Sequence, residues 1–170
     1  AEGADALVFD VKTGNGAFMK TLEDARQLAR SLVNTGGSLQ KKIVAVLTRM
    51  ETPLGAKVGN FLEVEESLAL LNCPQALDKT PSDARSSDLL EVTLHLGAWM
   101  VRVAGLAESV DTARERCRSV LEDGSAWERM KRNIELQGGD LGRMYRSLGT
   151  LRAPVEAEFR AARSGYVGRV

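Results

Sequence analysis

The chain has 170 residues with 23 basic and 23 acidic side chains, so its formal net charge at pH 7 is zero. A balanced charge argues against a dedicated nucleic-acid-binding protein, which needs a surplus of Lys and Arg to face phosphates. A hydrophobic content of 44% and a charged content of 27% are typical of a globular protein with one core.

The sequence also indicates where in the cell the protein is expected. No stretch approaches the roughly 20 apolar residues of a membrane span, and the first residues lack the pattern of a secretory signal. We therefore expect a cytoplasmic protein with no membrane partner. The two cysteines, Cys73 and Cys117, are far apart without CxxC spacing, which indicates neither a zinc site nor a disulfide framework. Because the chain lacks an initiator methionine and begins almost at once with an apolar run, we expect an interior piece of a longer protein.

The first third of the chain predicts a βαβ unit. Residues 6–11 form a short apolar run that predicts a buried strand. Thr21 with Asp24 three positions later predicts the start of a helix, which should end at Gly36-Gly37. Residues 43–47 predict a second strand, because β-branched residues favour that conformation. Two strands joined by one helix should be parallel, with a right-handed crossover.

The rest of the chain predicts mainly helices. A surface loop is expected over residues 73–86, where prolines and small polar residues gather. Ser109 is the expected cap of one helix, and the capping box S-A-W-E at residues 125–128 predicts the start of the next. Beyond Pro154, apolar and charged residues alternate over 155–160, which predicts a half-buried strand. The expected helices cover residues 58–71, 88–106, 109–121, a segment from 125 to the glycines at 138–139, and 141–148.

The stretch D-V-K-T-G-N-G-A-F-M at residues 10–19 follows the first predicted strand directly. In open α/β sheets, ligands bind at the carboxyl ends of strands, and glycines let the backbone approach a ligand closely. The stretch matches neither the dinucleotide-binding fingerprint nor a phosphate-binding P-loop. By itself it fits an ordinary glycine-containing turn equally well. Lys12 in this stretch can either face an anion or pair with Asp10.

A second stretch begins about forty residues later, with M-E-T-P-L-G-A-K-V-G-N at residues 50–60 and F-L-E-V-E-E-S-L at 61–68. Together, D-V-K-x-G-x-G-A-F-M and L-T-x-M-x-x-P-L-G-x-x-V-G-N-x-L-E-V-x-E resemble the thymidine phosphorylase and pyrimidine-nucleoside phosphorylase family. The tail S-G-Y-V-G at residues 164–168 resembles the start of that family's C-terminal lobe. The resemblance therefore covers nearly the whole chain.

The resemblance implies an α/β fold with a partial parallel or mixed sheet. A βαβ unit should be followed by several helices and then by the start of a C-terminal α+β lobe. Residues 1–150 would be the second half of the α/β lobe that binds phosphate and nucleoside, and residues 151–170 would begin the C-terminal lobe. Members of this family are homodimers.

The activity implied by the resemblance is reversible phosphorolysis of a pyrimidine nucleoside, which gives the free base and (deoxy)ribose 1-phosphate. The family's phosphate motif and its base-binding arginine, serine and lysine precede this segment. No catalytic residue is therefore assigned here, and the isolated chain is expected to be inactive. The alternative is a non-catalytic βαβ module that binds a nucleotide or a protein. The related phosphoribosyl transferases are disfavoured, because the first motif fits the phosphorylases better.

The resemblance also implies two sites. Phe18 would border the pyrimidine base, and its alternative role is a core plug at the helix entrance. The main-chain carbonyls of Leu54 and Lys57 with the carboxylate of Glu66 would hold a potassium ion, since such cations prefer oxygen ligands. The Lys57 ammonium must then point away, and the alternative for Glu66 is a solvated surface position. His95, the only histidine, is expected to be a packed core residue.

Overall fold

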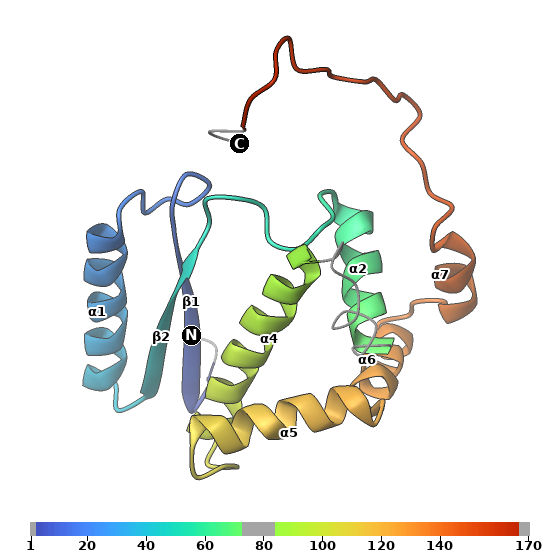
Figure 1. Ribbon diagram of the computed structural model, residues 1–170. Helices are drawn as coiled ribbons and strands as arrows, with labels where there is room; N and C mark the ends of the chain where they lie inside the picture. The colour runs from blue at the N-terminus through green and yellow to red at the C-terminus, as the bar shows by residue number, and fades with distance from the viewer. Residues whose placement is uncertain (1–2, 73–83, 167–170) are drawn as a thin grey trace.

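The computed structural model describes residues 3–72 and 84–166. Figure 1 shows two neighbouring strands with α1 on one side and α4 on the other, and α2, α6 and α7 grouped beyond α4. This arrangement confirms the predicted α/β class. The elements in chain order are β1 (Ala6–Thr13), α1 (Leu22–Ser38), β2 (Lys42–Arg49), α2 (Asn60–Asn72), α4 (Ala84–Val103), α5 (Val110–Glu122), α6 (Ser125–Leu136) and α7 (Leu141–Ser147).

The two strands are parallel, as predicted, with Phe9 opposite Ala45 and Val11 opposite Leu47. Side chains alternate between the two faces of a sheet, so these four share one face. That face packs against α1, and the opposite face is directed toward α4. The cluster between the sheet and α1 consists of Val11, Ala25 and Ala29, with Phe9, Met19, Leu32, Ala45 and Leu47 packed against it.

Helix α1 begins where the sequence predicts but ends later. The Thr21 side chain accepts a hydrogen bond from the Asp24 amide at 3.1 Å, which confirms the predicted cap. The helix then continues to Ser38, so the predicted end at Gly36-Gly37 is wrong. A Cβ atom at Gly36 would lie 1.9 Å from Cγ1 of Ile43. Glycine at position 36 therefore lets α1 approach β2 closely. It does not end α1.

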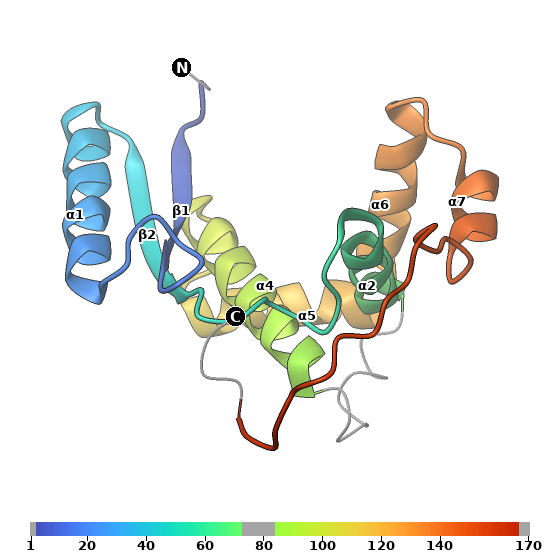
Figure 2. The same cartoon turned by 90° about the horizontal axis from the view of Figure 1, so that it is seen from above.

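A second cluster lies on the far side of α4. Leu90 and Leu94 of α4 pack there with Leu70 of α2 and Leu121 of α5. Figure 2 shows α4 between the strands and the other helices, with α5 crossing beneath. Helix α4 therefore joins the βαβ unit to the helical part of the chain.

Several predictions for the helices need correction. Residues 84–86, expected in a loop, already belong to α4, and the rest of that loop (residues 73–83) lies outside the described residues. Ser109 caps α5 as predicted. The capping box at Ser125 is wrong, because the residue before α6 is Gly124, which has a φ of +79° and makes no side-chain cap. None of the helices in the described ranges has the length and hydropathy of a membrane span.

The strand predicted over residues 155–160 is not formed. This segment has no regular secondary structure, and the Phe159 side chain is 99% exposed. Alternating apolar residues make a strand only when a neighbouring strand accepts their hydrogen bonds. The described part of the chain places no such neighbour beside this segment.

Substituting Gly36 by alanine should destabilise the protein by about 1–3 kcal/mol, because the added methyl group overlaps Ile43 and forces β2 or α1 to shift. Urea-induced unfolding of the variant and the wild type measures the difference.

Gly37→Ala is the matched control, because a Cβ atom there meets nothing within 4 Å. It should be neutral or should stabilise the helix by up to about 1 kcal/mol, since alanine favours helix over glycine. Equal effects of the two substitutions would contradict the assignment of Gly36 to close helix–strand packing.

Candidate functional site

A pocket of about 380 Å³ opens where the two parallel strands end. This is the position at which ligands bind in open α/β sheets. Its walls come from both strands, from the loops that follow them and from helices α2 and α4. The lining residues are Lys12, Gly16, Thr48, Arg49, Met50, Glu51, Thr52, Pro53, Leu54, Glu63 and Val92.

The charges around this pocket nearly balance. The Lys12 ammonium donates to Oδ2 of Asp10 at 2.6 Å, and the Thr48 hydroxyl donates to Oδ1 of the same carboxylate. Of the two alternatives for Lys12, the structure therefore shows the pairing with Asp10. The other charged lining residues are one arginine, Arg49, and two glutamates, Glu51 and Glu63. The pocket has no surplus of positive charge for an anion.

The glycine-containing loop folds back over the segment that follows β2. The Gly16 amide donates to the main-chain oxygen of Met50 at 2.9 Å. Gly14 has a φ of +125°, and a Cβ atom there would lie 2.8 Å from Oε1 of Glu51. The two motifs found in the sequence are therefore in direct contact, and glycine is required where they meet.

Phe18 lies on this loop with its side chain 97% exposed. The alternative role as a core plug is therefore wrong, and the neighbouring Ala17 is buried instead. The Phe18 ring does not line the pocket, whereas Gly16, on the same loop, does.

Glu66, in the helical part of the second motif, is a buried carboxylate. It is only 6% exposed, and its two oxygens accept hydrogen bonds from the amides of Ala56 at 2.8 Å and Lys57 at 3.1 Å. The preceding amide, that of Gly55, donates to Asp88 of α4 at 3.1 Å. Three consecutive amides of the loop are thus bound to two carboxylates. Glu66 is consequently not a solvated surface residue.

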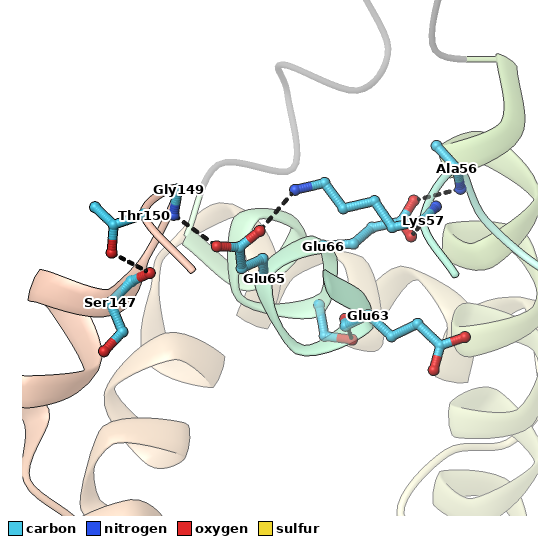
Figure 3. A network of polar contacts seen from close by, with 9 residues as sticks. Ala56, Lys57, Glu63, Glu65, Glu66, Ser147, Gly149 and Thr150 are labelled. Atoms are coloured by element: carbon cyan, nitrogen blue, oxygen red, sulfur yellow. Dashed lines mark hydrogen bonds and ion pairs between the residues drawn. The ribbon is translucent and has the colours of Figure 1, made fainter. Parts of the chain in front are cut away.

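The neighbouring Glu65 has a different set of partners, shown in Figure 3. It accepts hydrogen bonds from the Lys57 ammonium at 3.0 Å and from the Gly149 amide at 2.6 Å. The Gly149 amide, followed by the Lys57 ammonium, holds the pKa of the Glu65 carboxyl below its ordinary value. The Lys57 side chain therefore points to Glu65 and away from Glu66, as a cation site at Glu66 requires.

The two residues predicted to supply main-chain oxygens to a cation line different pockets. Leu54 lines the pocket at the strand ends, whereas Lys57 lines a second pocket of about 340 Å³ next to α6 and α7. Sequence reasoning missed Glu65 and Asp88, and their roles follow from contacts with distant residues that no local pattern indicates.

Parallel strands joined by a helix, with a pocket at their carboxyl ends, define an α/β domain of the kind in which ligands bind at this edge of the sheet. The glycosyl transferase family, a/b domain, matches residues 1–127, and the chain belongs to this family. The chain is 41% identical over 170 residues to the pyrimidine-nucleoside phosphorylase of Staphylococcus haemolyticus (strain JCSC1435), covering 100% of the chain and 37% of that protein. It is 39% identical over 167 residues to the pyrimidine-nucleoside phosphorylase of Staphylococcus aureus (strain bovine RF122 / ET3-1), covering 98% of the chain and 36% of that protein.

These similarities confirm the family resemblance carried by the two motifs. The chain spans somewhat more than a third of the length of the curated relatives it matches.

Gly55→Ala should destabilise the protein by about 2–5 kcal/mol. A left-handed backbone costs a residue with a Cβ atom about 1–2 kcal/mol, and here the Cβ atom would lie 2.7 Å from Oε2 of Glu66. Displacing that carboxylate would take the acceptor away from the amides of Ala56 and Lys57, at a further cost of about 1–3 kcal/mol. Chemical denaturation measures the loss.

Gly105→Ala separates the two contributions, because Gly105 has the same φ of +76° with nothing within 4 Å of its Cβ position. It should show the backbone cost alone. If Gly55→Ala is no more damaging than Gly105→Ala, the Glu66 carboxylate does not hold the loop.

Proposed function

We propose that the chain is part of a pyrimidine-nucleoside phosphorylase. Such an enzyme catalyses phosphorolysis. Phosphate attacks the anomeric carbon of a pyrimidine nucleoside, the bond to the base breaks, and the free base and a pentose 1-phosphate form. The observation that carries the proposal is 41% identity along the whole chain to a protein of that name. By the same resemblance we infer a cytoplasmic homodimer.

The balanced charge of the pocket at the strand ends supports a nucleoside-binding role for it. A neutral nucleoside needs shape and hydrogen bonds, whereas phosphate needs a local excess of positive charge. Here the Lys12 ammonium is already paired with Asp10, and the two glutamates outnumber the one arginine. We therefore place the nucleoside at this pocket and the phosphate outside it.

Phe18 is our candidate for contact with the base. Its exposed ring stands on the loop that also supplies Gly16 to the pocket wall. An aromatic ring beside a flat heterocycle contributes about 0.5–1.5 kcal/mol beyond the burial of its area. The exposure of the ring supports this role, because the described residues leave it uncovered.

We also propose that Glu66, with the main-chain oxygens of Leu54 and Lys57, binds a potassium ion that orders the loop. The donor set is chemically suitable, since carboxylate and carbonyl oxygens are the ligands that hard cations prefer. Gly55 supports the fit, because any larger residue would enter the space next to the Glu66 carboxylate. Within the described ranges, no group of three or more His, Cys, Asp or Glu residues is arranged to hold a metal ion.

The test of the activity is a phosphorolysis assay on the full-length protein, with Phe18→Ala as the variant. The wild type should release free base from thymidine or uridine only when phosphate is present. The variant should raise the KM for the nucleoside by about 5–30-fold, corresponding to about 1–2 kcal/mol of lost contact. The KM for phosphate should change less than about twofold, because the ring touches the base and not the anion.

Leu136→Ala is the control, because it also removes an exposed apolar side chain, on α6 and away from the glycine loop. It should leave both KM values unchanged. Nucleoside binding without any phosphate-dependent release of base would favour a non-catalytic binding module.

Glu66→Gln should weaken the stabilisation of the full-length protein by potassium. A cation that binds only the folded state raises Tm by mass action, by an amount set by its concentration relative to Kd. The glutamine lacks the negative charge and can accept only one of the two amide hydrogen bonds. Thermal unfolding is followed over a range of KCl concentrations, with choline chloride keeping the ionic strength constant.

Since the glutamine also removes a loop hydrogen bond, the quantity to compare is the potassium-dependent rise in Tm and not Tm itself. Identical rises in the two proteins, or no rise in either, would place any cation site away from Glu66.

A further inference from the structure

Two consecutive carboxylates of α2 hold opposite ends of one lysine. The Lys57 amide donates to Glu66 at 3.1 Å, while the ammonium of the same residue donates to Glu65 at 3.0 Å. Successive residues of a helix point in directions about 100° apart, so the two carboxylates face different surroundings. Figure 3 shows the lysine side chain running from the loop, past Glu66, to Glu65.

Glu65 is held in place by a second partner that does not involve the loop. The amide of Gly149, just after α7, donates to Oε1 of Glu65 at 2.6 Å. The Glu65 side chain is 9% exposed, against 44% for that of Lys57. The acceptor is therefore fixed and largely enclosed, and the more exposed lysine side chain is the part that it positions.

An ammonium group carries the same single positive charge as the potassium ion that we propose at Glu66. The ammonium of Lys57 is attached to a residue whose own amide already contacts Glu66. A tethered group of this kind acts at a high effective concentration. If Glu65 did not hold it, the ammonium could reach the Glu66 carboxylate and compete there with potassium.

We propose that Glu65 is a positioning residue that holds the Lys57 ammonium away from Glu66 and so keeps the cation position accessible. This inference rests on the proposed potassium site. It gives Glu65 a role in cation binding without making it a ligand. It also makes the turn after α7 part of the arrangement, since Gly149 orients Glu65.

The experiment measures the apparent potassium affinity of the full-length protein from Tm against KCl concentration at constant ionic strength. Glu65→Ala should weaken the affinity at least about fivefold, the lower end of ordinary coupling between sites. Glu65→Gln should weaken it similarly, although glutamine can still accept from Gly149, because it no longer binds the ammonium as an ion pair. The double variant Glu65→Ala/Lys57→Met should restore the wild-type affinity, since the competing ammonium is gone.

Glu122→Ala is the control for removing an exposed carboxylate, because Glu122 lies on α5 and does not line the pocket at the strand ends. It should leave the potassium affinity unchanged. An unchanged affinity in both Glu65 variants would overturn the inference while leaving the potassium site intact. A loss that persists in the double variant would also overturn it, since Glu65 would then act through the fold. A wild type that shows no potassium-dependent rise in Tm would remove the site itself, and the inference with it.

Discussion

The carboxylate of Glu66 is buried, and a buried charge is stable only when hydrogen bonds replace the water it has lost. The amides of Ala56 and Lys57 supply those bonds, so the loop after β2 must keep the conformation that presents both of them. Gly55 makes this conformation possible through its positive φ. The path of the loop depends on this interaction, and the loop sets the point from which the Lys57 side chain reaches Glu65.

The pocket at the strand ends depends on a second constraint, the contact between the two sequence motifs. Gly16 binds the main chain of Met50, and Gly14 leaves room for the Glu51 carboxylate. The glycine loop and the loop after β2 therefore form one connected wall. The parallel register of the strands brings the two loops to the same edge, where neither could form the pocket alone.

The sequence was sufficient to predict features with a local cause. Apolar runs marked both strands, and Thr21 with Asp24 marked the start of α1. Features set by distant contacts were not predictable in this way. Gly36 was expected to end α1 because its packing partner, Ile43, could not be identified, and Glu65 was overlooked because its partner lies 84 positions away. The alternation at residues 155–160 predicted a strand, but no local pattern reveals whether a neighbouring strand exists.

The position of α4 has a consequence for how the molecule unfolds. Leu90 and Leu94 carry the helix into the cluster with α2 and α5, and its C-terminal end, at Met100 and Val103, lines a pocket together with Ala6 and Val8 of β1. Helix α4 thus contacts both the strands and the other helices, so separating it from either side would weaken its hold on the other. The sheet and the helices should therefore lose their structure in one cooperative transition, with α4 among the last elements to exchange its amide hydrogens.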